Sequence, residues 1–504
     1  MPRPAPGDFL AGASVALVLI PQSLAYAQLA GMPAYRGLYA AALPPIAAAL
    51  FASSPYLQTG PVALTSLLAF GVLSALATPG SNEYVELGIL LALVVGVVRL
   101  AVGLLNAGVI AYLISRPLLL GFMPAAAILI IASQLPAALG ASPEGDGILE
   151  RAAWTVVHPD SWTSASLLLS AVVIVLMVGG RLIHKLFPSV LLAVGLGLAY
   201  STLADYDGPT VGPIPEGLPP VSLYLPWAEL PSLLIAGAVI ALVGFIEPSS
   251  IARTFAAEER QPWNANREFS GQGAANIAAG LTGGFPVGGS FSRSALNREA
   301  GAKTRWSGAV TGATVLVFLP FAGFLSSLPT AVLAAIVIGA VASLVRPLPI
   351  LWLARFSRLQ FGVAATTFVL TLALAPRVDK AVLIGIGLAV AAHLWRELSL
   401  EVPSWTDAET LHLRPRGVLW FGSAARLEDT FLALLGAHPD ARRLVIHLDG
   451  VGRIDTTAAL ALRSLIGDAR KAGLSVELAD VRPRWRRLVD GVIEREQDPL
   501  GAGT

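Results

Sequence analysis

The sequence of 504 residues contains no cysteine, and only 13% of its residues are charged. The absence of cysteine excludes disulfides, thiol catalysis and thiolate metal sites. The six histidines are scattered without a metal-ligand spacing, so no metal or other cofactor is expected. The formal net charge is +1, which gives no indication of nucleic-acid binding.

Hydrophobic residues make up 55% of the chain. Soluble domains carry about 25% charged residues, roughly twice the share found here. This composition is typical of a polytopic α-helical membrane protein. The opening MPRPAPGD has neither the charged region nor the cleavage site of a signal peptide, so the first apolar segment is expected to be retained.

Fourteen apolar segments, two of them short, are predicted to span the membrane. They cover residues 9–30, 37–52, 60–77, 83–105, 107–135, 165–182, 189–203, 230–252, 269–282, a half-helix that begins at Ser290, 308–325, 330–345, 361–375 and 381–394.

The charges of the connecting loops orient these spans. If the N-terminus lies inside, the cytoplasmic connections are rich in Lys and Arg, for example at Arg253, Arg260 and Arg267. The two longest external loops carry mostly Asp and Glu, and a short external turn with Arg377 and Lys380 is the exception. This positive-inside pattern predicts an even number of spans with both ends in the cytoplasm.

The stretch GGFPVGGSFSRSALN, residues 283–297, interrupts the apolar pattern with Gly, Pro, Ser and Arg. Irregular backbone at membrane depth is tolerated only where it is buried in protein or lines a cavity. We interpret it as an extended segment followed by a half-helix that starts in mid-membrane near Ser290. The free N–H groups of that helix start, its dipole and Arg293 predict an anion site. The alternative is an arginine at a helix end that reaches the cytoplasmic interface.

A weak internal repeat accompanies this stretch. TGPVALTSLL, from Thr59, resembles GGSFSRSALN, and IPQSLAYA, from Ile20, resembles IEPSSIAR, from Ile246. Broken short segments at matching places in two seven-span halves predict an inverted repeat with the site at the repeat interface.

Glu247 is the clearest acidic residue within a predicted span. A carboxylate at this depth is costly unless it is paired or protonated, so Glu247 is the candidate carrier of a coupling proton. The alternatives are a neutral, hydrogen-bonded side chain or an ion pair with Arg293.

Further polar residues lie within the spans. Gln22 and Tyr26 are one turn apart on the first span and could donate hydrogen bonds to a substrate or pack between helices. Thr65 and Ser66 on the third span could likewise bind a substrate or pack between helices. Asn276 lies among small residues that allow close helix packing, which favours a structural role.

The composition changes after Glu401, which predicts a transmembrane domain at 1–400 and a second domain at 401–504. In the tail, LVIHLD (444–449) and LSVELADV (474–481) are predicted strands. IDTTAALALRSLIGDARKAG is a predicted helix that stops at Gly473, and VRPRWRRLVDGVI starts another. Alternating strands and helices predict a small α/β domain.

Three blocks resemble the sulfate permease (SulP) family of anion transporters. They are PQSLAYAQLAGMPAYRGLYAAALPP, then FIEPSSIARTFA with NREFSGQGAANIAAGLTGGFPVGGSFSRSALNREAGAKTRWSG, and finally LVIHLDGVGRIDTTAALAL, which resembles the cytoplasmic STAS domain of that family. The resemblance spans nearly the whole chain and points to a bacterial member. In two places the chain departs from the family: Asp455 precedes Thr456 and Thr457 where soluble STAS regulators have a phosphorylated Asp-Ser pair, and Arg36 stands where a shorter or apolar residue is usual.

The resemblance implies a fourteen-span, seven-plus-seven inverted repeat, shared with nucleobase transporters. Spans one to four and eight to eleven would form a core domain, and the others a gate domain. It also implies a homodimer in the bacterial inner membrane, a cytoplasmic STAS domain and an elevator-like motion. The substrate would bind between the N-termini of spans three and ten. Carried over by position, the site comprises Gln22, Tyr26, the backbone at Val62 and Ala63, Glu247, Ser292 and Arg293.

The expected function is secondary active transport of a small anion, such as a dicarboxylate, sulfate or bicarbonate, in symport with a proton. The expected partners are the anion, the proton and membrane lipid, without nucleic acid and without enzymatic activity. An uncoupled anion exchanger or channel is the alternative. A membrane-anchored STAS signalling protein is disfavoured because no kinase, cyclase or nucleotide motif is present, and a nucleobase symporter because Arg293 favours an anion.

Overall fold

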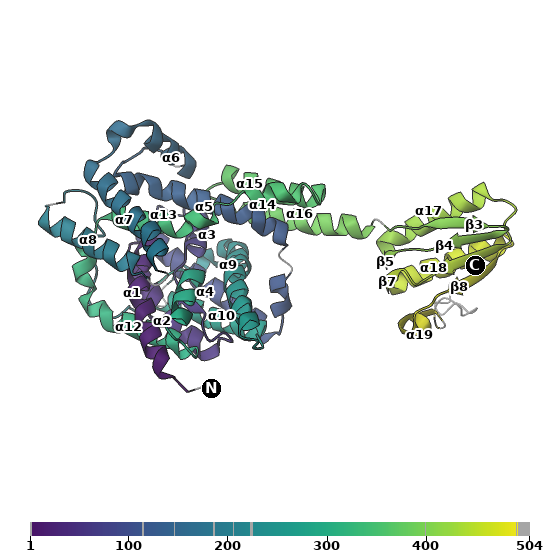
Figure 1. The fold of residues 1–504 in the computed structure, drawn as a ribbon, viewed down its shortest axis with the longest axis horizontal. Coiled ribbons are helices and arrows are strands. Elements are labelled where there is room, and N and C mark those ends of the chain that lie inside the picture. The colour runs from purple at the N-terminus through teal and green to yellow at the C-terminus, as the bar shows by residue number, and fades with distance from the viewer. Residues whose placement is uncertain are drawn as a thin grey trace. The chain divides into compact units, whose positions relative to one another are not determined.

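The computed structural model describes residues 3–112, 115–145, 147–184, 187–204, 206–221, 225–398, 400–489 and 491. The chain divides into two compact units, Met1–Ala389 and Val390–Thr504, and each contains a large hydrophobic cluster of its own (Figure 1). The first unit is helical, and the second combines strands with helices.

Each predicted span has a matching helix in the first unit, and the last of these helices continues past the division between the units. They are α1 (Pro6–Leu29), α2 (Arg36–Phe51), α3 (Ala63–Leu73), α4 (Asn82–Leu104), α5 (Arg116–Leu139), α7 (Ser164–Ile183), α8 (Ser189–Leu203), α9 (Leu230–Glu258), α10 (Ala265–Leu281), α11 (Phe291–Glu299), α12 (Trp306–Phe318), α13 (Thr330–Val341), α15 (Arg358–Ala373) and α16 (Val378–Leu398). In the described part of the chain, seven helices are long and apolar enough to cross a membrane, and five more are shorter apolar helices.

Several short elements were not predicted. They are α6 (Ile148–Val157), α14 (Leu348–Leu353) and the 3₁₀ segments η1 (Gly108–Tyr112), η2 (Pro159–Ser161), η3 (Trp227–Glu229), η4 (Leu319–Ser327) and η5 (Ala342–Leu344). The α6 helix buries Ile148, Ala152 and Thr155 along one side and presents charged residues on the other. Its apolar stripe is too short to stand out in a hydropathy pattern that is dominated by the spans.

The spans pack as two groups (Figure 1). In one group, α2 lies against α10 and α12, α4 lies against α9 and α10, and α1 lies against α2 and α12. In the other, α5 packs on α13 and α15, while α7 packs on α8 and α13. The first group therefore contains spans one to four and eight to eleven, which is the expected core, and the second is the expected gate.

Two short strands join the halves of the core group. β1 (Gln58–Gly60) pairs antiparallel with β2 (Gly288–Ser290), with Thr59 opposite Gly289. The half-helices α3 and α11 begin directly after these strands, so they start side by side from one small sheet. Antiparallel pairing is the relation that an inverted repeat requires, and the repeat predicted from the sequence is present in the fold.

The α10 helix supplies hydrogen bonds to the broken backbone. The Asn276 side chain accepts from Val287 N (2.9 Å) and donates to Val287 O (3.1 Å), and Gln272 Nε2 donates to Thr59 Oγ1 (2.7 Å). Asn276 and Gln272 are fully buried. Since unpaired main-chain groups are costly away from water, Asn276 replaces partners that a continuous helix would have provided, whereas Gln272 holds the Thr59 side chain on β1. The structural role favoured for Asn276 is therefore observed.

Arg36, a departure from the family pattern, closes the end of α10. Its Nη1 atom donates to Gly283 O (3.0 Å), and its guanidinium lies over the rings of Tyr35 and Tyr39, at 5.2 and 5.8 Å from their centroids. Gly283 has a φ of 72°, the left-handed conformation that ends many helices. The arginine thus satisfies a carbonyl at the negative end of the α10 dipole.

The second unit is a small α/β domain. Its main sheet has the order β3 (Ser404–Asp407), β4 (Thr410–Leu413), β6 (Arg443–His447), β8 (Ser475–Ala479), in which only the β3–β4 pair is antiparallel. β5 (Gly417–Leu419) and β7 (Val451–Ile454) form a separate parallel pair. The helices are α17 (Phe421–Ala437), α18 (Thr456–Lys471) and α19 (Arg486–Leu488), with the 3₁₀ segment η6 (Pro483–Trp485).

The strands β6 and β8 and the helix α18 are the elements predicted in the tail; the shorter β3, β4, β5 and β7 and the helix α17 were missed. Asp455 caps α18, because its Oδ1 accepts from Ala458 N at 2.7 Å. Gly473 follows α18 with a φ of 86°. The helix predicted in VRPRWRRLVDGVI corresponds to η6 and α19, while Asp490 and residues from 492 onward lie outside the described residues.

We predict that a chain ending at Glu401 still inserts into the membrane, because α16 is complete at Leu398 and no span is lost. The measurement is the share of protein in the membrane fraction and its size-exclusion profile in detergent. A chain ending at Ala389, which removes the second half of α16, is the control and is expected to be aggregated or degraded. Failure of the longer chain to insert would show that the boundary at 400 is misplaced.

Candidate anion-binding site

The candidate site is built around the first turn of α11. Ser290 is the N-cap, in extended conformation, and its Oγ accepts from Arg293 N at a long 3.5 Å. Val62 occupies the corresponding N-cap of α3. The first N–H groups of a helix have no partner within the helix, and they carry the positive end of its dipole. The β1–β2 pair therefore places two such helix starts together.

Arg293 ties the start of α11 to two other core elements. The side chain is 1% exposed; its Nη1 donates to Gln22 Oε1 on α1 (3.2 Å), and its Nη2 donates to Pro61 O between β1 and α3 (2.8 Å). Its Nε is buried and has no hydrogen-bond partner within the described structure. A buried donor without a partner is costly, so this N–H is available to an acceptor on a ligand.

The ion pair between Arg293 and Glu247, one of the alternatives that the sequence left open, is absent from the described structure. The hydrogen-bond acceptors of Arg293 are neutral, and within the described chain no carboxylate lies within ion-pair distance of it. Glu247, half-buried on α9, instead accepts from Phe291 N through Oε1 at 3.4 Å. The start of α11 attracts the carboxylate because its N–H groups need acceptors and its dipole favours negative charge.

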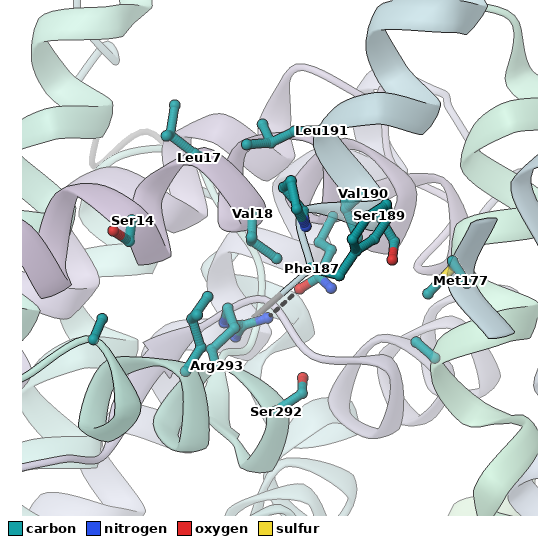
Figure 2. Close-up of a pocket in the computed structure, with 15 residues that line it drawn as sticks. Ser14, Leu17, Val18, Met177, Phe187, Ser189, Val190, Leu191, Ser292 and Arg293 are labelled. Atoms are coloured by element: carbon teal, nitrogen blue, oxygen red, sulfur yellow. Dashed lines mark hydrogen bonds between the residues drawn. The ribbon is translucent and has the colours of Figure 1, made fainter. Parts of the chain in front are cut away.

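Two cavities flank the start of α11. The first, of about 340 Å³, lies between α1, α11 and the start of α8. Figure 2 shows Arg293 and Ser292 on one side of this cavity and Phe187 and Ser189 on another, with the hydrogen bond from Arg293 dashed. The second cavity, of about 560 Å³, lies between α3, α9 and α11 of the core and α5 and α13 of the gate.

The structure brings all seven predicted site residues to these cavities but divides them. Gln22, Ser292 and Arg293 line the first cavity, and the second is lined by Tyr26, Val62, Ala63, Glu247 and also Ser292. Ser292 is the predicted residue shared by both. Their roles in binding remain predictions.

Thr65 and Ser66 are fully buried. The Thr65 Oγ1 donates to Val62 O at 3.3 Å, within its own helix. For Thr65 the packing use fits better, because a hydroxyl bonded to its own helix is occupied. The Ser66 hydroxyl is buried without a hydrogen-bond partner in the described structure, so its use stays open.

Sequence reasoning missed two groups of residues. Phe187 and Ser189 at the start of α8 line the first cavity, and no local pattern marks them because packing of the gate group brings them there. Arg99 on α4 is fully buried and donates to three main-chain carbonyls. The signal for Arg99 was available, since a charged residue inside an apolar span is a functional candidate by the same rule that selected Glu247.

Comparison with known families covers both units. Residues 6–367 match the Sulfate permease family, and residues 404–494 match the STAS domain. The "Probable sulfate transporter 4.2" of Arabidopsis thaliana is 31% identical, over 94% of this chain and 76% of that protein. The "Probable sulfate transporter Rv1739c" of Mycobacterium tuberculosis is 38% identical, over 72% of this chain and 65% of its own length.

Solved structures share the fold at lower identity. The murine Solute Carrier 26 family member A9 anion transporter, in its inward-facing state, matches with a TM-score of 0.87 and 20% identity, over 97% of this chain and 88% of that one. The transmembrane domain of the cyanobacterial bicarbonate transporter BicA matches with a TM-score of 0.65 and 23% identity, over 76% of this chain and 97% of that one. At these sequence identities the structural similarity shows a shared fold and nothing about substrate.

We predict that Arg293→Ala abolishes anion binding and leaves the protein folded, because it removes the buried guanidinium at the two helix starts. Arg293→Lys should restore binding only in part, since an ammonium lacks the planar fork that matches carboxylate and sulfate oxygens. Binding is measured by calorimetry on detergent-purified protein, and folding by thermal melting.

Arg305 provides the matched control, because its Nη1 also donates to a main-chain carbonyl, Ala52 O at 2.6 Å, but it lines neither cavity. Arg305→Ala should therefore change melting more than affinity. Unchanged affinity in Arg293→Ala would remove Arg293 from the site.

Proposed function

The chain belongs to the sulfate permease family, and on that premise we propose that it is a secondary active transporter that moves a small anion together with a proton. The observation that carries this proposal is the buried Arg293 at the joined starts of α3 and α11, with its Nε free of any partner in the described structure. The substrate classes are dicarboxylate, sulfate and bicarbonate.

The chemistry of the site supports an anion. A guanidinium is always charged, and its planar fork matches the paired oxygens of carboxylate and sulfate. Two helix starts add main-chain donors and favourable dipoles. Sulfate transport by named relatives and bicarbonate transport by a protein of the same fold support the same substrate class.

Glu247 provides the coupling. Its carboxylate occupies the first N–H of α11, where an incoming anion would also bind. Two negative groups at one helix start repel each other strongly at low dielectric, so the anion favours a protonated Glu247. Protonation also releases the Phe291 N–H for the anion. Proton and anion then bind together, because the anion and the ionised Glu247 carboxylate compete for the start of α11 rather than for Arg293.

The two helix groups support movement of the core against the gate. Both cavities lie between the groups, and both are lined by Leu296 of α11 and Ala340 of α13. These residues lie toward the helix ends that the loop charges assign to the cytoplasm, so we assign this conformation to the inward-facing state. Elevator-like alternating access, a homodimer, the bacterial inner membrane and a cytoplasmic STAS domain complete the proposal.

The alternative is an uncoupled anion exchanger. One observation favours it: a carboxylate bonded to Phe291 N can act simply as a cap for α11, without exchanging protons. The two functions differ in whether a proton gradient accelerates uptake.

We predict that Glu247→Gln binds anion but loses stimulation by an inward proton gradient, because the amide imitates the protonated carboxyl permanently. Uptake of labelled sulfate, which stays a dianion throughout this range, is measured in proteoliposomes at external values of about pH 5 and about pH 8, with the interior near pH 7.5. Succinate and bicarbonate take up protons at the lower value, so they are compared with sulfate at about pH 8 alone. Uptake by the wild type should be faster at the lower external pH. Uptake by the Gln variant should proceed at about the same rate at both external pH values.

Glu258→Gln is the control for this experiment, because Glu258 lies on the same helix, pairs with Arg298 and lines neither cavity. It should keep the response of the wild type. Acceleration of the Glu247→Gln variant at low pH would place the coupling proton elsewhere. A wild type without any pH response would support the uncoupled exchanger.

A further inference from the structure

Arg99 is a buried charge that the proposed mechanism does not use. It lies on α4 within the apolar run GILLALVVGVVRLAVGL, and no part of it is exposed. Within the described chain, no carboxylate lies within ion-pair distance of it. A charge inside a span is expensive and is kept where it serves a function.

The partners of Arg99 are all main-chain carbonyls. Nε donates to Ala241 O (2.9 Å), Nη2 to Ile240 O (3.4 Å) and Nη1 to Val287 O (2.9 Å). Ile240 and Ala241 precede Glu247 on α9, and Val287 directly precedes β2. Carbonyl dipoles solvate the guanidinium, but they do not cancel its charge, which is permanent in proteins.

The guanidinium lies directly behind the candidate anion site. A Cβ added to Gly244 would stand 2.7 Å from Arg99 Nη2 and 3.0 Å from Thr65 Cγ2. A Cβ added to Gly288 would stand 3.5 Å from the same Thr65 methyl and 3.1 Å from Val62 Cγ2. Val62 lines the larger cavity. The layer between Arg99 and the site therefore consists of Gly244 and Thr65, with Gly288 and Val62 beyond them.

We propose that Arg99 is a positioning residue of the anion site, and that its fixed charge makes the site prefer divalent over monovalent anions. It holds α9 against the segment that leads into β2, and it adds a second positive charge behind the start of α11. The intervening layer is protein rather than water, so the charge is poorly screened. This inference rests on the proposed function, because it concerns the same site.

The charge and the hydrogen bonds of Arg99 have different signatures. The energy of a Coulomb interaction is proportional to the charge of the ligand, so removing Arg99's charge costs a dianion twice the binding energy that a monoanion of the same shape loses. The affinity for the dianion therefore falls by the square of the factor by which the affinity for the monoanion falls. Loss of the hydrogen bonds that position α9 and the segment before β2 lowers the affinities for both ions by one common factor. The ratio of the two affinities therefore reports the charge alone.

Three full-length variants separate these effects. Arg99→Gln keeps donors for the carbonyls and removes the charge, and Arg99→Met is a second neutral variant of similar length. Arg99→Lys replaces the permanent charge with an ammonium, from which burial can remove the proton. The probes are sulfate and perchlorate, which are tetrahedral oxyanions of charge two and one, and succinate with its monoamide, succinamate. Dissociation constants are measured by calorimetry in one detergent and salt, and folding by thermal melting.

We expect Arg99→Gln, or Arg99→Met if the Gln variant does not fold, to lose about threefold in affinity for the monoanions and about tenfold for the dianions. Arg99→Lys should keep the ratio of the two affinities within about twofold of the wild type at a pH low enough to protonate its ammonium. Arg305→Gln, a buried arginine away from both cavities, should leave the ratio unchanged.

An equal loss for both charges in the neutral variants overturns the inference while anion transport stands. A wild type that binds none of the four probes overturns the proposed function, and this inference with it.

Discussion

Main-chain hydrogen bonding away from water is the constraint on which the rest of this structure depends. Inside a bilayer every N–H and C=O needs a partner, yet the chain interrupts its helices before α3 and again before α11. The β1–β2 pair and Asn276 supply partners to the interrupted backbone. What remains without partners within a helix is the first turn of α3 and of α11, and these are the groups that suit an anion.

The same constraint explains where the charges lie. A guanidinium buried among carbonyls is tolerated because its N–H groups satisfy acceptors, as Arg293 does at Pro61 and Arg99 does at Val287. A carboxylate is tolerated at Glu247 because the start of α11 offers it an N–H. In the proposed mechanism, fixed positive groups are balanced against the Glu247 carboxylate, and binding of an anion shifts that balance toward the protonated form.

The packing of the two helix groups determines access to the site. Core helices contribute the half-helix starts. On the gate side, α8 and α13 line the first cavity, and α5 and α13 line the second. Ser292 lines both cavities, so a ligand at the start of α11 is within reach of both. A movement of one group against the other would open or close both cavities without disturbing the β1–β2 pair, which lies entirely within the core.

The sequence by itself determined the spans, the two interrupted segments and the candidate residues Arg293 and Glu247, because hydropathy, Gly-Pro breaks and charges at membrane depth are local signals. The resemblance to a family added Val62 and Ala63, whose side chains carry no chemical signal. Only the tertiary structure decided that Arg293 bonds to Gln22 and Pro61 rather than to Glu247, and that the site residues divide between two cavities. It also placed Arg99 behind the site. These pairings join residues far apart in the chain, and the packing of the helices, rather than any local pattern, determines which donor reaches which acceptor.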